Sequence, residues 1–239
     1  MSDAARALGV SEATVRRDFN SLARQQLVTR THGGVVASSV AYDLPVRYRA
    51  NQGDAREKIA ATAAALVEPG QVVGFNGGTT TSATARRLAA RNDLADAGTR
   101  PGLTVVTNAL NIATEMVLRP HIRTVTLGGT ARPQSYENVG PLAAGLLREI
   151  WIDHLFLGVD GFGADAGASC FHEDEAGINA LMVERSSRVT VVAAAEKIGR
   201  RSFARICDTG AVSGLVTDRS ADPDELEQLR SQGVEVLTV

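Results

Sequence analysis

Hydrophobic residues change their spacing along the chain, and from about residue 57 short apolar runs alternate with longer helical patterns. The short runs are rich in β-branched residues, which is typical of buried strands, and the intervening segments are rich in helix formers. Buried strands separated by helices predict an α/β fold in which helices cover a mostly parallel sheet. The expected strands are 72–75, 103–107, 123–127, 154–159, 189–193, 214–217 and 234–239, and the expected helices are 58–67, 82–91, 109–118, 142–150, 174–186 and 223–232.

The first 36 residues follow a different pattern. A short helix is expected to end at Gly9, and Ser11 is expected to cap a second helix over 12–26. In the second helix Val15, Phe19 and Leu22 are spaced by four and three residues, which gives one buried face. Two helices joined by a glycine-containing turn are typical of a helix-turn-helix.

Residues 27–36 predict a wing next to these helices, because two short strand patterns flank the glycine pair Gly33-Gly34. The polar positions of the second helix and of the wing are left for solvent or for DNA phosphates. We expect DNA contacts from Thr14, Arg16, Arg17, Arg30 and His32.

The segment 37–56 is polar and contains several turn-forming residues, so it is interpreted as a linker. The predicted organisation is a partial winged helix-turn-helix over 1–36, the linker, and a large α/β domain over 57–239.

The charge is distributed unevenly along the chain. The formal net charge is −2, but residues 1–56 carry eight arginines and five acidic residues, so the remainder carries about −5. A mildly basic head on an acidic body suits DNA contact through the head alone. Two cysteines are too few for a disulfide framework, and neither a signal peptide nor a long apolar run is present, so a cytoplasmic protein without a membrane partner is expected.

The stretch from Val72 to Thr81 predicts a binding site for an anion. A buried strand ends at the turn Asn76-Gly77-Gly78, Thr79 is expected to cap the following helix, and further threonines follow. Glycines let backbone N–H groups approach a ligand, hydroxyls donate, and the helix dipole favours negative charge. The alternative is a tight βα turn in which the threonines only cap the helix.

Four other strand ends also carry glycine, polar or charged residues, and ligands of open α/β sheets bind beyond these ends. Glycines and hydroxyls suit phosphate oxygens, Arg132 and Lys197 supply positive charge, and Asn108 with Asp160 suit sugar hydroxyls. Each has a structural alternative: a helix cap for Asn108, a solvated loop for Arg132, a plain turn for Asp160, and a pair with the neighbouring glutamate for Lys197.

Residues 172–175 form a His-Glu-Asp-Glu run that has the composition of a metal site, but carboxylates at a helix N-terminus explain most of it. Cys170 has no general-base partner in the sequence. We therefore expect no metal, no cofactor and no catalytic residue.

The segment "GVSEATVRRDFNSLARQQLVTRTHGGVV" (9–36) resembles the winged-helix segment of the DeoR family of bacterial transcriptional regulators. The stretches "GGTTT", "TVVTNALNIA", "LGGTAR", "DHLFLGVDGF", "MVERSSRVTVVA" and "EKIGRRSF" follow in the order of that family, so the resemblance covers nearly the whole chain. It implies a sugar-phosphate sensor domain of the ribose-5-phosphate isomerase-like fold, with phosphate on the Gly77–Thr81 loop and Lys197. The implied partners are operator DNA, a phosphorylated sugar or polyol, and further copies of the chain. The expected effector contacts are Asn76, Gly77, Gly78, Thr79, Thr80, Thr81, Thr107, Asn108, Gly129, Arg132, Asp160, Glu175 and Lys197.

The family has one more helix ahead of this helix pair, and that helix would precede Met1. Two helices and a wing have little hydrophobic core of their own. We therefore expect the chain starting at Met1 to bind DNA poorly, either because its start is truncated or misassigned or because the head has lost its function.

Two functions fit these patterns. The first is a regulator, most simply a repressor of a carbohydrate operon that a phosphorylated sugar or polyol releases from DNA. The second is a sugar-phosphate isomerase with a vestigial head, which requires a positioned base. Asp160 and Glu175 are the candidate bases, but neither has an orienting partner in the sequence. The recognition-helix pattern has no reason to exist in an enzyme, so the regulator is favoured.

Overall fold

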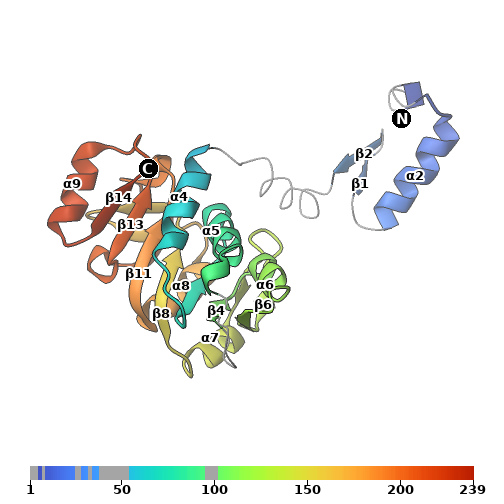
Figure 1. Cartoon of the computed structure of the whole chain (residues 1–239). Helices are drawn as coiled ribbons and strands as arrows, with labels where there is room; N and C mark the ends of the chain where they lie inside the picture. Colours follow the sequence, from blue (N-terminus) through green and yellow to red (C-terminus); the bar gives the residue numbers. More distant parts are fainter. Residues whose placement is uncertain (1–4, 7–8, 25–27, 32–33, 38–53, 95–101) are drawn as a thin grey trace. The chain divides into compact units, whose positions relative to one another are not determined.

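The computed structural model describes residues 5–6, 9–24, 28–31, 34–37, 54–94 and 102–239. By their internal contacts the residues divide into two compact units, Met1–Asn51 and Gln52–Val239. Figure 1 shows the elements of both units.

In the first unit, helix α2 (Glu12–Arg24) begins where the sequence predicts. Ser11 caps it, because the backbone N–H of Thr14 donates to the Ser11 Oγ at 3.2 Å. The preceding helical turn ends at Gly9, which has a φ of 66°, and the N–H of Val10 donates to the carbonyl of Ala5 at 3.1 Å. This 6→1 bond is the Schellman closure of a helix by a left-handed glycine.

The strands β1 (Val28–Thr31) and β2 (Gly34–Ala37) pair antiparallel, with Thr31 opposite Gly34. The two predicted strands and their pairing are therefore confirmed, and the predicted turn between them lies outside the described residues.

The second unit is built on a seven-stranded sheet in the order β14-β13-β11-β8-β3-β4-β5. All six pairs of neighbouring strands are parallel, which confirms the predicted α/β class. The strands are β3 (Val72–Phe75), β4 (Leu103–Thr107), β5 (Ile122–Thr126), β8 (Ile152–Leu157), β11 (Ser186–Val192), β13 (Gly214–Thr217) and β14 (Glu235–Thr238).

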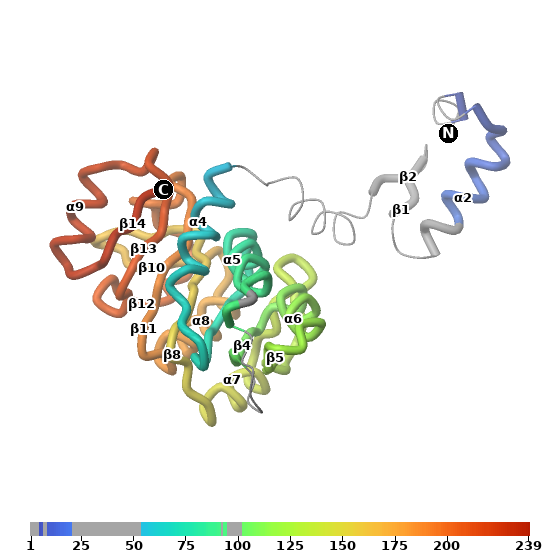
Figure 2. The backbone as a smooth tube through the Cα atoms, viewed as in Figure 1, coloured from blue at the N-terminus to red at the C-terminus, as the bar shows by residue number. Residues whose placement is uncertain are grey.

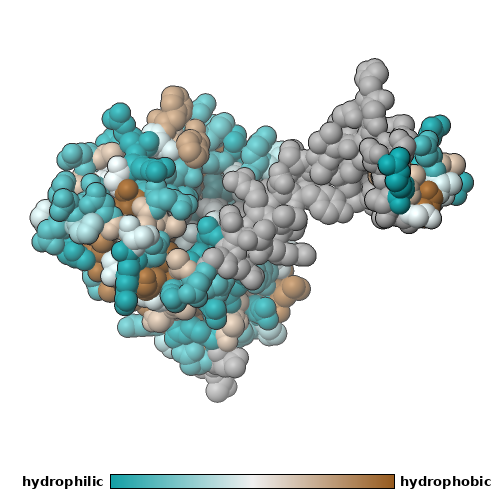
Figure 3. Space-filling view, turned by 90° about the horizontal axis from the view of Figure 1, so that it is seen from above, coloured by the Kyte–Doolittle hydropathy of each residue, from teal (hydrophilic) through white to brown (hydrophobic). Residues whose placement is uncertain are grey.

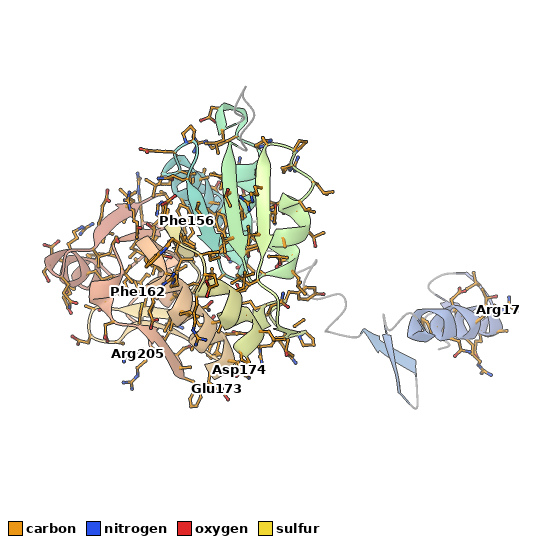
Figure 4. All side chains as sticks on the ribbon, turned by 90° about the horizontal axis from the view of Figure 1, so that it is seen from below. Arg17, Phe156, Phe162, Glu173, Asp174 and Arg205 are labelled. Carbon is orange, nitrogen blue, oxygen red and sulfur yellow. The ribbon has the colours of Figure 1, made fainter. Side chains whose placement is uncertain are left out.

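Helices cover both faces of this sheet. The helices α4 (Asp54–Ala65), α5 (Thr79–Ala89) and α6 (Leu110–Met116) share one hydrophobic core with the sheet, and in it Phe75 stacks on Phe156 at 5.5 Å. The helices α7 (Pro141–Leu147), α8 (Glu173–Glu184) and α9 (Pro223–Ser231) share the other core, which contains Phe162. Figure 4 labels Phe156 and Phe162 inside the unit.

Two helices begin earlier than the sequence predicts. Helix α5 begins at Thr79 and its N-cap is Gly78, so the expectation that Thr79 caps a helix starting at residue 82 is wrong. Gly78, with a φ of 142°, supplies the non-helical cap residue itself, and the Thr81 hydroxyl donates back to the Gly78 carbonyl at 3.0 Å. Helix α4 begins at Asp54, whose carboxylate pairs with Lys58 one turn later at 2.7 Å.

The sequence analysis missed several short elements. A sheet in the order β12-β10-β9 lies beside α8 (Figure 2). Its strands have only three or four residues each, and β9 and β10 contain glycines, so neither length nor periodicity identifies them. The missed elements are β6 (Thr130–Ala131), β7 (Asn138–Val139), β9 (Gly161–Gly163), β10 (Gly167–Cys170), β12 (Ala204–Cys207) and the 3-10 turns η1 (Asn92–Leu94), η2 (Ala195–Lys197) and η3 (Thr209–Ala211).

The outer surface of the second unit is mostly hydrophilic in the view of Figure 3, where hydrophobic residues form small separate patches. Within the described ranges, none of the helices has the length and apolar character needed to cross a membrane.

Candidate functional site

The candidate site lies where β3 and β8 meet in the centre of the sheet. From β3 the chain proceeds outward to β4 and β5, and from β8 it proceeds the other way to β11, β13 and β14. The carboxyl ends of two such strands form the crevice at which open α/β sheets bind ligands.

Asn76, at the end of β3, joins the two strand ends. Its side-chain N–H donates to the carbonyl of Gly158 at 2.9 Å, and its Oδ1 accepts from the N–H of Gly158 at 2.7 Å. Asn76 is buried, so its amide already has a structural role between β3 and β8.

The turn after Asn76 leads into the first turn of α5 and presents backbone donors at this crevice. Gly77, Gly78 and Thr79 are partly exposed. The first N–H groups of a helix have no intrahelical acceptor, and the positive end of the helix dipole lies there. Thr80 and Thr81 are buried, and the Thr81 hydroxyl donates to the Gly78 carbonyl. The backbone N–H groups of the first turn are therefore the donors that the helix itself leaves without an acceptor.

Thr107 and Asn108, at the end of β4, are fully buried. The Thr107 Oγ1 accepts from the N–H of Ala109 at 3.0 Å and turns the chain from β4 into α6. The Asn108 carbonyl accepts from the N–H of Asn138 at 2.7 Å, which fixes β7 against the end of β4. Thr107 and Asn108 therefore fix the positions of α6 and β7 beside the site, and both residues are themselves buried.

The hairpin β6–β7 closes one side of the site. Gly129 has a φ of 138°, and a Cβ there would lie 2.6 Å from the Val139 carbonyl oxygen, so close backbone packing requires glycine. Arg132 follows β6, and its Nε lies 2.9 Å from the Glu175 Oε1, while its Nη1 lies 2.8 Å from the His172 Nε2. Arg132 is therefore held by the beginning of α8 and is not a solvated loop residue.

Lys197 approaches the site from η2. Its Nζ donates to the Val159 carbonyl at 2.5 Å and lies 3.5 Å from the Asp160 Oδ1. The Asp160 Oδ2 accepts from the N–H of Phe171 at 3.2 Å. The neighbouring Glu196 is thus not the partner that holds Lys197; Asp160 is.

The sequence analysis missed one group at the centre of the site, the side chain of Glu137. Its Oε1 accepts a hydrogen bond from the backbone N–H of Gly77, and the residue is only 3% exposed. Burial, and then the nearby Glu175 carboxylate, raise the pKa of Glu137 to about 8, although hydrogen bonds from Gly77 and Asn108 act in the opposite direction. The signal in the sequence is that Glu137 is the single charged residue between Arg132 and Arg148.

The two carboxylates that act on Glu137 electrostatically, Glu175 and Asp160, each belong to an ion pair of predicted effector residues. Arg132 pairs with Glu175 and Lys197 pairs with Asp160, so each cation has an acidic partner. With Glu137 protonated at neutral pH, the formal charges of the cluster balance. A ligand that brings its own negative charge can therefore take over the two cations, while the released carboxylates accept hydrogen bonds from hydroxyl groups.

The run at residues 172–175 forms the beginning of α8. His172 is the N-cap, Glu173 and Asp174 lie on the outer surface with most of their side chains exposed (Figure 4), and Glu175 turns toward Arg132. In the described part of the chain, no group of three or more His, Cys, Asp or Glu side chains is arranged to hold a metal ion. Burial raises the pKa of the Cys170 thiol to about 12, so the reactive thiolate is not populated at neutral pH.

A hollow lies on the outer surface between α4 and α5. Its two arginines are engaged: Arg87 pairs with Glu57 at 2.7 Å, and Arg91 pairs with Asp93 at 2.6 Å. The hollow is lined by Ala61, Ala64, Ala65, Arg87 and Arg91.

The residues predicted to contact DNA lie in the first unit. Arg16 and Arg17 are exposed on α2 (Figure 4 labels Arg17), and the Thr14 hydroxyl lies 2.9 Å from the Ser11 hydroxyl. Arg30 lies on β1 but its side chain is outside the described part of the structure, and His32 is outside the described residues altogether.

Two family models match the chain. The DeoR-like helix-turn-helix domain matches residues 1–40, and the DeoR C-terminal sensor domain matches residues 51–219, which is more than half of the chain. The chain belongs to the DeoR family. It is a DNA-binding transcriptional regulator with an N-terminal helix-turn-helix and a C-terminal sensor.

Full-length relatives agree with this membership in the DeoR family. An HTH-type transcriptional regulator GlpR of Haloferax volcanii is 35% identical over 96% of this chain and 87% of its own length. A putative aga operon transcriptional repressor of Escherichia coli O157:H7 is 31% identical over the whole chain and 87% of its own length. The glycerol-3-phosphate regulon repressor of Escherichia coli K12 is 29% identical over 87% of the chain and 80% of its own length.

Solved structures similar to this DeoR-family chain match it more distantly. The sorbitol operon regulator SorC of Klebsiella pneumoniae is 11% identical, covers 85% of this chain and 90% of its own, and has a TM-score of 0.41. Ribose 5-phosphate isomerase A of Methanocaldococcus jannaschii is 18% identical, covers 58% of this chain and 51% of its own, and has a TM-score of 0.39.

Proposed function

We propose that this protein is a cytoplasmic repressor of a carbohydrate operon, which a phosphorylated sugar or polyol releases from its operator. The names of several relatives, among them the aga operon and glycerol-3-phosphate regulon repressors, support this proposal. The observation that carries it is the Gly77–Gly78 turn and the first turn of α5 at the ends of β3 and β8. Beside this turn lies Glu137, on which the carboxylates of the Lys197–Asp160 and Arg132–Glu175 ion pairs act.

The phosphate binds at the N-terminus of α5. The N–H groups of Gly78, Thr79 and the following residues donate to its oxygens, and the helix dipole favours its charge. Lys197 lies close to a carbonyl and a carboxylate of the β8 end, and the approach of a dianion draws its ammonium toward the phosphate.

The sugar or polyol end of the ligand lies toward Asp160 and Glu175. These carboxylates accept hydrogen bonds from hydroxyl groups once their cations turn to the phosphate, with Asn108 and Glu137 behind them. This exchange of partners gives the ligand a different affinity for the two states of the sensor, which is what control of DNA binding requires.

The isomerase alternative is less well supported. The relatives reported above are named as transcriptional regulators or repressors. Asp160 is paired with Lys197 and Glu175 with Arg132, so neither carboxylate stands free as a base in the present arrangement. Turnover of ribose 5-phosphate by the purified protein would establish that it is a sugar-phosphate isomerase.

Calorimetric titration tests the proposed ligand class directly. Glycerol 3-phosphate, ribose 5-phosphate and glucosamine 6-phosphate are titrated into the 239-residue chain beside glycerol, ribose and glucosamine. We expect at least one phosphate to bind and its unphosphorylated parent to bind at least tenfold more weakly, since charge-assisted hydrogen bonds contribute about 1.5–3 kcal/mol each. Equal affinities for a phosphate and its parent would contradict the phosphate subsite.

A further inference from the structure

The side chain of Glu137 lies directly against the turn that is proposed to hold phosphate. Its Oε1 accepts the N–H of Gly77, and a Cβ placed on Gly77 would collide with the same carboxyl group. The preceding residue, Tyr136, has a φ of 61°, which is unusual for a residue with a side chain. Its carbonyl accepts from the N–H of Leu110 at 2.9 Å, so the left-handed conformation is fixed against α6 next to Glu137.

The carboxyl group has an unmet hydrogen-bonding requirement. Glu137 Oε2 and Asn108 Oδ1 are both buried, and neither has a hydrogen-bond partner within the described structure. Both atoms are acceptors when Glu137 is ionised, and an unsatisfied buried polar atom costs about 1–3 kcal/mol. Protonation removes the charge of the Glu137 carboxyl group, and a neutral carboxyl costs less to bury than an ionised one.

The surrounding charges also favour the protonated form. Glu175 approaches from α8 and Asp160 from the end of β8, and both raise the pKa of Glu137 in addition to its burial. The cations of the site are Arg132, which is engaged with Glu175, and Lys197, which is engaged with Asp160. Glu137 is thus neutralised by a proton, whereas Glu175 and Asp160 are each paired with a cation.

We propose that Glu137 is a positioning residue of the effector site, whose uncharged carboxyl holds the Gly77–Gly78 turn in the shape that receives phosphate. This inference rests on the proposed function. Glu137 acts through the turn, because its side chain is buried and its Oε1 accepts a hydrogen bond from the backbone N–H of Gly77.

The proposal has a consequence for pH. An ionised Glu137 places a negative charge behind the turn that holds the phosphate, and this repulsion weakens binding. By linkage, a bound phosphate opposes ionisation of Glu137, so binding takes up a proton at a pH above its pKa of about 8. Affinity therefore falls by at most about twofold from pH 7 to 8 and by up to about tenfold per pH unit at higher pH.

The test is calorimetry of the full chain with glycerol 3-phosphate, ribose 5-phosphate and glucosamine 6-phosphate at pH 7.5, 8.5 and 9.5. The phosphate esters are dianions over most of this range, since their second pKa is about 6. Each titration is repeated in two buffers of different ionisation enthalpy, which measures proton uptake without any substitution. The variant Glu137→Gln keeps an oxygen acceptor for Gly77 and cannot ionise. Glu115→Gln is the matched control, because burial also raises the pKa of Glu115, which lies on α6.

We expect the unmodified chain and Glu115→Gln to lose about tenfold or more in affinity between pH 7.5 and 9.5 and to take up protons on binding. Glu137→Gln should lose much less affinity between pH 7.5 and 9.5 than the unmodified chain does, and it should take up fewer protons on binding. A sugar phosphate that binds the unmodified chain equally at both pH values, without proton uptake, would overturn the role of Glu137 and leave the proposed function standing. Absence of binding by all three phosphates at every pH would contradict the proposed function and this inference together.

Discussion

At the scale of single residues, the site is a set of charges that neutralise one another. Lys197 holds Asp160, Arg132 holds Glu175, and Glu137 is neutralised by a proton. An anionic ligand is the kind of molecule that can rearrange such pairs, because both cations are only partly buried and are close to hydrogen-bond acceptors.

Lys197 supplies positive charge at the end of β8. Lys197→Ala should therefore lower the affinity for a sugar phosphate by about ten- to a hundredfold. This loss corresponds to one or two factors of ten, at about 1.4 kcal/mol each. The chain offers a matched control, because its other lysine, Lys58, forms an exposed pair with Asp54 on α4. Lys58→Ala should bind as the unmodified chain does. Calorimetry measures both variants, and unchanged affinity in Lys197→Ala would remove this residue from the site.

A second residue-scale prediction concerns stability in acid. His154 is buried on β8 beside Phe156, its Nε2 lies 2.8 Å from the Thr190 Oγ1, and burial lowers its pKa from 6.5 to about 4. Between pH 6.5 and 4 the unfolded chain binds more protons than the folded one, so stability is complete above pH 6.5 and decreases as the pH falls through this window.

Urea unfolding at pH 4.5, 5.5 and 7 checks this sign. In His154→Gln the loss of stability between pH 7 and 4.5 should be smaller than in the unmodified chain by about 1 kcal/mol or more. The control is His121→Gln, at the position before β5. The prediction fails when His154→Gln loses as much stability on acidification as the unmodified chain.

At the scale of elements, the junction between β3 and α5 carries the phosphate subsite. Gly78 is both the N-cap of α5 and a residue with a φ of 142°, and a Cβ there would lie 3.0 Å from the Thr81 Oγ1. Gly78→Val should abolish sugar-phosphate binding, since a β-branched side chain resists this conformation and blocks the approach to the N–H groups.

The control for Gly78→Val is Gly145→Val on α7, where a Cβ meets open space. Thermal unfolding should show that both variants are folded, and calorimetry should show binding by Gly145→Val alone. Normal binding by a folded Gly78→Val would place the phosphate elsewhere.

The elements that the sequence predicts well are those with a strong period of their own. The parallel strands and their covering helices follow from apolar runs and helix formers, as with β4 and α9. The turn after β3 and the cations Arg132 and Lys197 also follow from the sequence, because strand ends are where ligands of such sheets bind.

The part that the sequence could not predict depends on long-range pairing. The sheet β12-β10-β9 consists of three- and four-residue strands that are stable only against each other and α8. Glu137 follows no strand of the main sheet, and it meets Gly77 only because β6–β7 folds back onto the end of β4. The sequence signal for Glu137 is that it is the single charged residue between Arg132 and Arg148.

At the scale of the whole molecule, the chain combines a DNA-binding unit and a sensor unit, as the two family models show. Arg16 and Arg17 lie exposed on α2, opposite the buried Val15. Arginines that contact phosphates contribute to affinity for any sequence and to its salt dependence, whereas those that contact bases contribute to specificity.

Arg16→Ala and Arg17→Ala should therefore each weaken operator binding, by about tenfold at physiological salt, and an arginine that contacts phosphate should also lower the salt slope by about one. Fluorescence anisotropy with an operator fragment obtained by selection from genomic DNA measures both quantities. The control is Arg205→Ala, because Arg205 is exposed on β12 of the sensor unit (Figure 4). Unchanged binding in both α2 variants would assign DNA contact to other residues.

The most direct test of the whole account is release of operator DNA by the ligand. The operator complex of the unmodified chain, formed at a protein concentration high enough to saturate the operator despite the weak DNA binding expected above, is titrated with the sugar phosphate that binds best in calorimetry and with its unphosphorylated parent. The titration is repeated with Lys197→Ala in place of the unmodified chain. We predict that the phosphate releases the DNA, that the parent does not, and that Lys197→Ala needs about ten- to a hundredfold more phosphate. A complex that stays intact when calorimetry shows the sensor saturated with sugar phosphate would contradict the account.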